Sequence, residues 1–295
     1  MAVLALDIGA TKLAAGLVDR HYGLHGVRRV AAAVDDPWAA CRELLLVVAG
    51  DNQVSAVGIG SAGPVDVPAG VIKPLNLVAW RDGFAIVDQV RALFPDAVVR
   101  LAIDGACLVL AEHRVGGLRG VDNGLALTVS SGVGGGIIAD GRVVVGRTGN
   151  AGHLGHLVVP GDDTACSCGG FGCVEAVASG LSSVRWARAR GWAGDSGVEL
   201  ASAANGGDPI ALAAMERAGT ALGQGIASAA ALLDVDRVVI GGGFAHSGEP
   251  LWGPLRAAVA RHSRLDFIRE LSVELSTLSE GATLVGAGVL AVEAG

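Results

Sequence analysis

The chain has 295 residues, of which 51% are apolar and only 17% charged, so it can bury a large core and is not globally disordered. Glycine contributes 46 residues without a three-residue period, which excludes a collagen-like rod. The formal net charge of −7 and the pI of about 5.5 argue against a general nucleic-acid or anionic-membrane binder, which needs a basic face.

The first part of the chain alternates between strand and helix patterns. Asp36 is the expected N-cap of the first helix, and the stretch 60–80 is rich in proline and glycine and long enough to be functional. Such an order predicts a sheet with helices packed on it. The expected strands cover residues 3–6, 13–18, 27–34, 54–59 and 97–103, and the helices residues 37–49, 84–94 and 104–115.

The second part of the chain repeats the opening pattern of strand, glycine turn and strand. It occurs near residue 7 and again near residue 130, which predicts two halves that are structural duplicates. The boundary is expected between residues 104 and 122, with 1–105 plus 281–295 as a small domain and 106–280 as a large one. The expected strands here cover residues 125–129, 136–139, 237–240 and 271–275, and the helices residues 173–190, 209–233, 250–262 and 282–292.

Two glycine-containing turns carry hydroxyl groups suited to phosphate. The first runs over residues 7–12, where Gly9 permits a tight turn, Thr11 offers a hydroxyl, Lys12 a positive charge and Asp7 a carboxylate that could orient Mg²⁺ through water. Taken alone, an ordinary hairpin with glycine at the bend is the commoner explanation of this turn. The second turn, residues 128–136, repeats the design, and together the two could hold phosphates from both sides. A third cluster, residues 241–243, ends a strand and could lie under a flat base.

Residues 58–63 match the pattern G-x-G-x-x-G after a strand, as in dinucleotide-binding proteins. The third glycine should open a helix, but Pro64 and Pro68 follow instead. We therefore interpret the segment as a tight turn that carries backbone close to a ligand.

Five cysteines occur in the chain, and three of them, Cys166, Cys168 and Cys173, fall within eight residues of a glycine-rich loop. In a reducing compartment this spacing favours metal over disulfide, and three thiolates with one histidine make a closed structural zinc site. His156 is the expected fourth ligand, although His153 could compete with it and a buried thiol cluster is the alternative.

The N-terminus supports a cytoplasmic location. The mean hydropathy is +0.52, but no apolar run approaches the ~20 residues of a membrane-spanning helix. The first residues lack a basic segment, and Asp7 interrupts their apolar run, so we expect no signal peptide.

Asp104 follows an apolar strand and precedes a helix. It can be an N-cap, or a catalytic carboxylate at the carboxyl end of a strand, where α/β proteins place such groups. Glu175 lies two residues after Cys173, so a metal loop would hold it rigidly.

Taken together, these motifs resemble the ROK family of bacterial sugar kinases and sugar-responsive repressors. The resemblance spans nearly the whole chain in the right order, and its cysteine motif is highly specific. The matching segments are residues 7–12, 61–66, 74–77 with Trp80 nearby, 130–136, 151–156 and 166–175.

The resemblance implies two actin-like, ribonuclease H-like α/β domains that close an interdomain cleft on ATP and a sugar. Asp104 would be the general base, which takes the proton of the primary hydroxyl. Since the first phosphate motif begins almost at residue 1, we expect a kinase rather than a DNA-binding repressor. It further implies a homodimer, Mg²⁺ and structural Zn²⁺. ATP and phosphate would contact Asp7, Gly9, Thr11, Lys12, Ser131, Gly132, Gly134, Gly241 and Gly242; the substrate would contact Gly63, Asn76, Ile103, His153, His156 and Glu175; and zinc would be held by His156, Cys166, Cys168 and Cys173.

Several positions depart from the family pattern. Ile103 stands where the family has Asn before its catalytic Asp, Ala106 where it has a second Asn, and His153 where it has a sugar-binding Glu. Ala10, Ser130 and Ser131 also replace the usual residues of the phosphate loops. A glucose hydroxyl facing Ile103 would lack a partner at roughly 1–3 kcal/mol, so we expect an amino sugar or a C7-cyclitol rather than glucose.

The first alternative to a kinase is a catalytically silent sugar sensor, and the second is a zinc hydrolase. The altered phosphate loops favour the sensor. Retention of Asp104, Lys12 and Thr11 favours the kinase, and the closed character of the expected metal site argues against the hydrolase.

Overall fold

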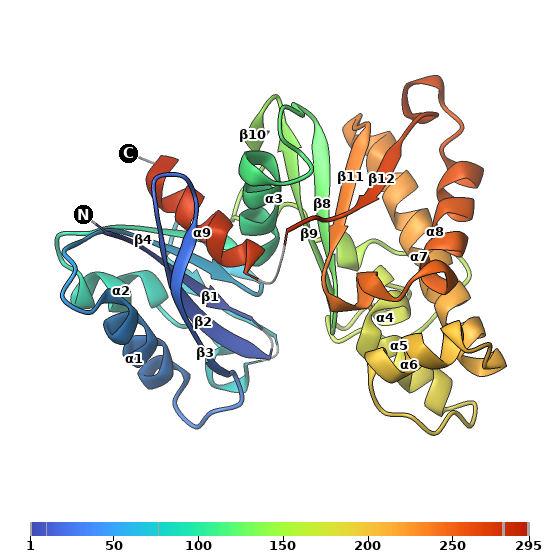
Figure 1. Cartoon of the computed structure of the whole chain (residues 1–295), viewed down its shortest axis with the longest axis horizontal. Helices are drawn as coiled ribbons and strands as arrows, with labels where there is room; N and C mark the ends of the chain where they lie inside the picture. Colours follow the sequence, from blue (N-terminus) through green and yellow to red (C-terminus); the bar gives the residue numbers. More distant parts are fainter. Residues whose placement is uncertain (1, 10, 76, 279–280, 294–295) are drawn as a thin grey trace.

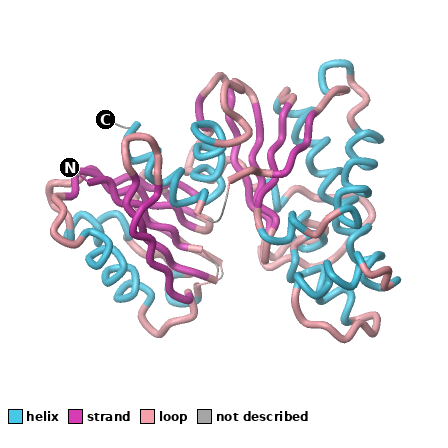
Figure 2. The backbone as a smooth tube through the Cα atoms, viewed as in Figure 1, coloured by secondary structure: helices cyan, strands magenta, loops and turns pink. Residues whose placement is uncertain are grey.

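The computed structural model describes residues 2–9, 11–75, 77–278 and 281–293. Ala10 and Asn76, expected near phosphate and sugar respectively, lie outside the described residues. Figures 1 and 2 show two lobes, each built on a mixed sheet, with helices α3 (Asp104–Val115) and α9 (Ala282–Glu293) between the sheets.

The two sheets have the same strand order, which confirms the predicted duplication. The first is ordered β3-β2-β1-β4-β7 and the second β10-β9-β8-β11-β12. In each, the first three strands of the lobe are antiparallel neighbours and the next two are added in parallel. The strands are β1 (Ala2–Ile8), β2 (Lys12–Val18), β3 (Leu24–Ala31), β4 (Val54–Ser61), β7 (Val98–Ile103), β8 (Gly124–Val129), β9 (Val133–Ala139), β10 (Arg142–Val143), β11 (Arg237–Gly241) and β12 (Ser272–Leu275).

Helices cover the outer faces of both sheets (Figure 1). The first lobe carries α1 (Pro37–Ala49), whose N-cap Asp36 accepts from Ala39 N as expected, and α2 (Ile86–Leu93). In the second lobe, α7 (Pro209–Leu233) has the predicted bounds, because Asp208 caps it and Pro209 opens it. The remaining helices are α4 (Val174–Ala178), α5 (Gly180–Arg188), α6 (Gly197–Asn205) and α8 (Glu249–His262).

Some predicted elements were wrong. A single helix over 173–190 is instead α4 and α5, because Ser179 is extended, caps α5 with its side chain, and the following Gly180 N donates to Ser130 O at 2.8 Å. The third strand begins and ends three residues earlier than expected. Sequence analysis also missed α6 and the small hairpin of β5 (Val65–Asp66) and β6 (Val71–Ile72). No helix opens after residues 58–63, which agrees with rejecting a dinucleotide site.

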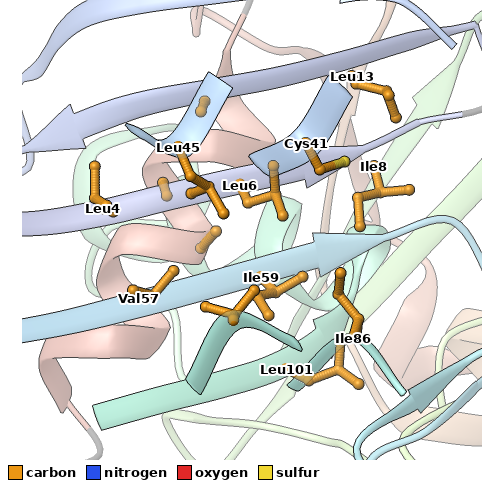
Figure 3. Close-up of a cluster of buried hydrophobic side chains, with 14 of the residues drawn as sticks. Leu4, Leu6, Ile8, Leu13, Cys41, Leu45, Val57, Ile59, Ile86 and Leu101 are labelled. Atoms are coloured by element: carbon orange, nitrogen blue, oxygen red, sulfur yellow. The ribbon is translucent and has the colours of Figure 1, made fainter. Parts of the chain in front are cut away.

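Each lobe has its own hydrophobic core. Figure 3 shows that of the first lobe, where Leu6 and Ile59 from neighbouring strands meet Leu45 of α1 and Leu101 of β7. Helix α3 belongs to both lobes. Its Cys107 packs in the first core, whereas Leu108 and Val109 pack against β8, β9 and β11 of the second sheet.

Glycines allow the lobes to approach closely around α3. A Cβ on Gly105 would lie 1.9 Å from Gly135 O of β9, and one on Gly286 of α9 would lie 1.6 Å from Cys107 O of α3. Backbone therefore packs directly on backbone where the two sheets meet. Among the described residues, no helix has the length and apolar character needed to cross a membrane.

Candidate active site

A cleft of about 920 Å³ opens at the ends of the two glycine turns and of α3. Both lobes contribute to it, and its lining includes the expected carboxylates, hydroxyls and histidines. Of the residues singled out from the sequence, the cleft is lined by Thr11, Gly63, Asp104, Ser131, Gly132, Gly134, His153, His156, Cys166 and Glu175.

Asp104 is the first residue of α3, directly after β7. It is not the N-cap, because Ile103 occupies that position; its Oδ1 accepts a hydrogen bond from Gly105 N at 2.7 Å. Burial raises the pKa of Asp104 to about 6, with a further rise from the charge of Glu175. A carboxylate with a raised pKa in a cleft is suited to proton transfer near neutral pH.

Asp7 lies close enough to Asp104 for the two charges to interact. Burial and the charge of Asp104 raise its pKa to about 7, while Lys12 and Arg29 act in the opposite direction. Two acidic side chains in one region make it favourable for a hard divalent cation, which binds oxygen ligands.

The first glycine turn joins β1 to β2. Gly9 N donates to Lys12 O at 2.9 Å, and Thr11 reaches the cleft. Lys12 is exposed at the start of β2 and, like Asp7 and Gly9, is not part of the cleft wall.

The second turn joins β8 to β9 and is closed by a 2.9 Å hydrogen bond from Ser130 N to Gly132 O. Ser131 and Gly132 face the cleft, and the Asp104 carboxylate lies beside Gly134, 3.9 Å from where a Cβ would be. Gly241 pairs with Thr128, and Gly242 packs against Val129. Both glycines therefore contact the strand that leads into the second turn, and neither is part of the cleft lining.

Glu175 of α4 is held by the second turn. Its Oε2 accepts from Val133 N at 2.9 Å, and a Cβ at position 132 would lie 2.7 Å from that oxygen, so Gly132 leaves room for the carboxylate. The sequence analysis expected a metal loop to hold Glu175; the structure shows a further contact, with the backbone of the second glycine turn.

Gly63, Ile103 and His153 lie close together beside the cleft. A Cβ on Gly63 would lie 2.8 Å from the His153 ring and 2.9 Å from Ile103 Cδ1. His153 Nε2 lies 3.4 Å from Asn150 Oδ1, and burial together with His156 lowers its pKa. Gly63 and His153 line the cleft here, whereas Ile103 is buried, is not part of the lining and packs against Gly63.

His156 and the three clustered cysteines form one group whose potential ligand atoms all lie within 4.8 Å of one another. His156 Nδ1 is 3.7 Å from Cys166 Sγ, and Cys168 Sγ is 3.8 Å from Cys173 Sγ. In a tetrahedron with Zn–S bonds of about 2.3 Å, ligand atoms are roughly 3.8 Å apart, so these residues fit a zinc ion. His153 lies outside the group, although its ring centroid is 5.5 Å from that of His156.

Sequence analysis missed part of the cleft lining. Ser182, Arg185 and Arg188 of α5, and Asp195 in the loop after it, also line the cleft. Arginines three positions apart on a helix look like an ordinary solvated face, so the sequence carries no signal that separates them from surface residues.

Comparison with known proteins places the chain in a family. The ROK family model matches residues 3–294. The glucokinase of Thermotoga maritima is 32% identical over 99% of this chain and 97% of its own length, and the N-acetylmannosamine kinase of Yersinia pseudotuberculosis is 32% identical over 98% and 97%.

Solved structures agree with this assignment. A ROK family glucokinase from Streptomyces griseus in complex with glucose and AMPPNP has a TM-score of 0.87 at 30% identity, covering 99% of this chain and 100% of its own. A ROK hexokinase from Thermus thermophilus has a TM-score of 0.86 at 34% identity, with complete coverage of both chains. The fold is therefore the two-domain, actin-like α/β fold of these kinases. The chain belongs to the ROK family.

Proposed function

We propose that this chain transfers the γ-phosphoryl group of ATP to the primary hydroxyl of a hexose-like acceptor. The broader statement, that it is an ATP-dependent sugar kinase, follows from its family membership and from relatives named as sugar kinases. The observation that carries the proposal is the position of Asp104, whose raised pKa and place between the two glycine turns suit a base for an incoming hydroxyl.

The proposed mechanism assigns the proton to Asp104. In its ionised form Asp104 accepts the proton of the acceptor hydroxyl as the oxygen–phosphorus bond forms, and the bond to the leaving ADP breaks. The Gly105 N–H holds the carboxylate by its Oδ1, which leaves the other oxygen to face the acceptor. Thr11 and the turn of Ser131 and Gly132 contact the phosphates from the two lobes.

ATP would be used together with Mg²⁺, which screens the charge of the phosphates. The acidic pair of Asp7 and Asp104 fits such an ion, because burial raises both pKa values, the charge of Asp104 raises that of Asp7 further, and a cation would relieve this. Lys12, at the start of β2, would add positive charge at the same turn.

We also propose that His156, Cys166, Cys168 and Cys173 hold a structural zinc ion. The support is the ligand spacing, which matches a closed tetrahedral site, and the donor set of three sulfurs and one nitrogen. Since Nδ1 of His156 faces Cys166, its Nε2 would remain for a sugar hydroxyl, and Glu175 would bind a second hydroxyl nearby. The metal would thereby fix the acceptor site.

The acceptor is proposed to be an amino sugar or another glucose analogue, such as a C7-cyclitol, rather than glucose. Ile103 offers no hydrogen bond where the family pattern has Asn, and His153 replaces a carboxylate that would accept from hydroxyls, so the region around Gly63 is poorly suited to the hydroxyls of glucose. We extend the proposal to a cytoplasmic homodimer that acts on a small molecule, not on nucleic acid or membrane, with domains of residues 1–105 plus 281–295 and 106–280.

The direct test is ADP release from Mg·ATP with glucose, mannose, N-acetylglucosamine, 3-amino-3-deoxyglucose and a C7-cyclitol as acceptors. We expect turnover that one of the non-glucose acceptors stimulates most and that Asp104→Asn abolishes. Glucose as the best acceptor would contradict the substrate proposal. No turnover with any acceptor, despite thermal stabilisation by ligand, would favour the silent sensor instead.

A further inference from the structure

Arg217 of helix α7 donates hydrogen bonds to two segments, one before and one after Cys173 in the chain. Its Nε and Nη2 donate to Asp162 Oδ2 at 3.1 and 2.7 Å, and Nη2 also donates to Thr164 Oγ1 at 2.8 Å. Its Nη1 donates to the backbone oxygen of Val177 at 2.7 Å. The side chains of Arg217 and Asp162 are only 16% and 21% exposed, so solvent screens this ion pair less than a pair on the open surface.

The first segment is the base of the loop that carries the three clustered cysteines, residues 162–173, which we call the cysteine loop. Asp162 Oδ1 accepts from Thr164 N at 2.9 Å, and Thr164 O accepts from Gly172 N at 2.9 Å. The two ends of the cysteine loop are therefore joined to each other. Because Arg217 binds the side chains of Asp162 and Thr164, it holds both ends at once.

The cysteine loop has little apolar packing of its own. In this fully described stretch no helix or strand forms, and Phe171, its large apolar side chain, is 62% exposed. Cys173 is buried, whereas Cys168 is exposed. A loop with few buried apolar contacts depends on polar contacts for its position. The hydrogen bonds of Arg217 supply such contacts and join the loop to α7, which packs in the core of the second lobe.

The second segment is helix α4, which begins directly after Cys173 and carries Glu175. A helix of five residues leaves most of its backbone oxygens without partners inside the helix, and a cation near its C-terminus is favourable. Arg217 brings that cation to the oxygen of Val177. It therefore holds the chain on both sides of Cys173, and the helix that it holds places Glu175 in the cleft lining.

We infer that Arg217 is a positioning residue, which ties the cysteine loop and α4 to α7 and so sets how firmly zinc is retained and how Glu175 meets the acceptor. This inference rests on the proposed function and on the proposed metal site. Arg217 is not part of the cleft lining, so it acts through the segments that it holds. In the described part of the chain its hydrogen bonds do not reach either glycine turn, so donor binding should not depend on it.

The first experiment measures the rate at which zinc passes from the purified protein to an excess of a chromogenic chelator. Arg217→Lys keeps the positive charge but lacks the planar fork of donors that serves three partners, and Arg217→Ala removes every contact. Because charge-assisted hydrogen bonds are lost, zinc release should be about tenfold faster or more in both variants.

Arg256→Lys and Arg256→Ala are the matched controls, since Arg256 is 53% exposed and pairs with Glu249 on helix α8. Both should release zinc at the wild-type rate. Release that is equally fast in Arg217→Lys and Arg256→Lys would overturn the inference, and this comparison decides even if Arg217→Ala fails to fold.

The second experiment separates the contact with Arg217 from the charge of the loop. Asp162→Asn removes the ionised partner of Arg217, whereas Asp163→Asn makes the same change in net charge at an exposed neighbour. Zinc release should accelerate in Asp162→Asn and stay near the wild-type rate in Asp163→Asn. Equal rates in these two variants would show that loop charge governs release, and would overturn the assignment of Arg217.

The third experiment is steady-state kinetics with the zinc-loaded protein. Arg217→Lys should raise the acceptor KM several-fold while the KM for MgATP stays within about twofold of the wild-type value. A purely structural loss would instead lower the amount of active enzyme, and with it kcat, at unchanged KM values. An unchanged acceptor KM, or an equal rise in both KM values, would overturn the link between Arg217 and the acceptor.

Failure of the proposed function is distinguishable from failure of this inference. If no acceptor is turned over, the kinase proposal fails, and the rates of zinc release still decide whether Arg217 holds the loop. If the purified protein contains no zinc, the metal proposal fails, and the acceptor KM of Arg217→Lys still decides whether Arg217 positions Glu175.

Discussion

Replacing Asp104 with Asn should stabilise the protein at alkaline pH while it abolishes transfer. In the folded state the pKa of Asp104 is about 6, raised from 3.8 chiefly by burial. A raised pKa means that the folded state binds more protons than the unfolded state between these values. Stability is therefore lost as pH rises through this window, and the full cost is present above about pH 6.

The size of the effect follows from the shift. About two pKa units correspond to roughly 3 kcal/mol, of which about half is expressed at pH 5. Asn is neutral and keeps an oxygen that can accept from Gly105 N, so the substitution removes the charge without removing that hydrogen bond. We expect the melting temperature to rise by several degrees at pH 8 and by about half as much at pH 5.

Differential scanning calorimetry at the two pH values measures this, with Asp88→Asn as control, since Asp88 is 72% exposed on α2. The control should change little at either pH. A melting temperature that falls at pH 8, or a gain of equal size at both pH values, would refute the view that burial of a charge raises the pKa of Asp104.

Three further predictions follow from the site and the seam between the lobes. The kcat/KM of the wild type should rise with pH through an inflection near 6, because Asp104 must be ionised to accept a proton; a flat profile between pH 5 and 8 would exclude it as the base. Metal analysis should find about one zinc per chain, and Cys168→Ser should lose it with a lower melting temperature while Ser167→Ala keeps both; a stable, zinc-free native protein would contradict the metal site. Gly105→Ala should destabilise the protein by about 1–3 kcal/mol in urea titration, because its Cβ would lie 1.9 Å from Gly135 O, whereas Gly206→Ala, with 3.4 Å of room, should be tolerated.

Much of the fold could be predicted from local signals. Asp208 and Pro209 mark the start of α7 in the sequence, and the helix has the predicted bounds. The break at Ser179 could not be predicted in this way, because it depends on the contact of Gly180 with Ser130, a residue some fifty positions away. The helical spacing of side chains carries no information about a backbone hydrogen bond to a turn that is distant in the sequence.

In the site, too, some features follow from local sequence signals and others only from contacts between distant residues. The spacing of the cysteines predicted their association, but only the fold places His156 rather than His153 among them. Asp104 was predicted as a candidate catalytic carboxylate from its place after a strand, and as the base from the family resemblance, whereas its raised pKa depends on burial in the folded chain. Arg185 and Arg188 carry no local signal, because their place in the cleft lining arises from α5 beginning at the glycine turn.

Helix α3 has a mechanical consequence for an enzyme of two lobes. It packs in both cores, in the first through Cys107 and in the second through Leu108 and Val109. Glycines at its contacts with β9 and α9 let the backbones lie directly against one another. A rotation of one lobe against the other that preserved both packings would therefore have its axis close to this helix. Points on a rotation axis move least, and Asp104 sits at the end of that axis. The groups that bind each substrate would travel with their lobes, while the group that receives the proton stays almost still.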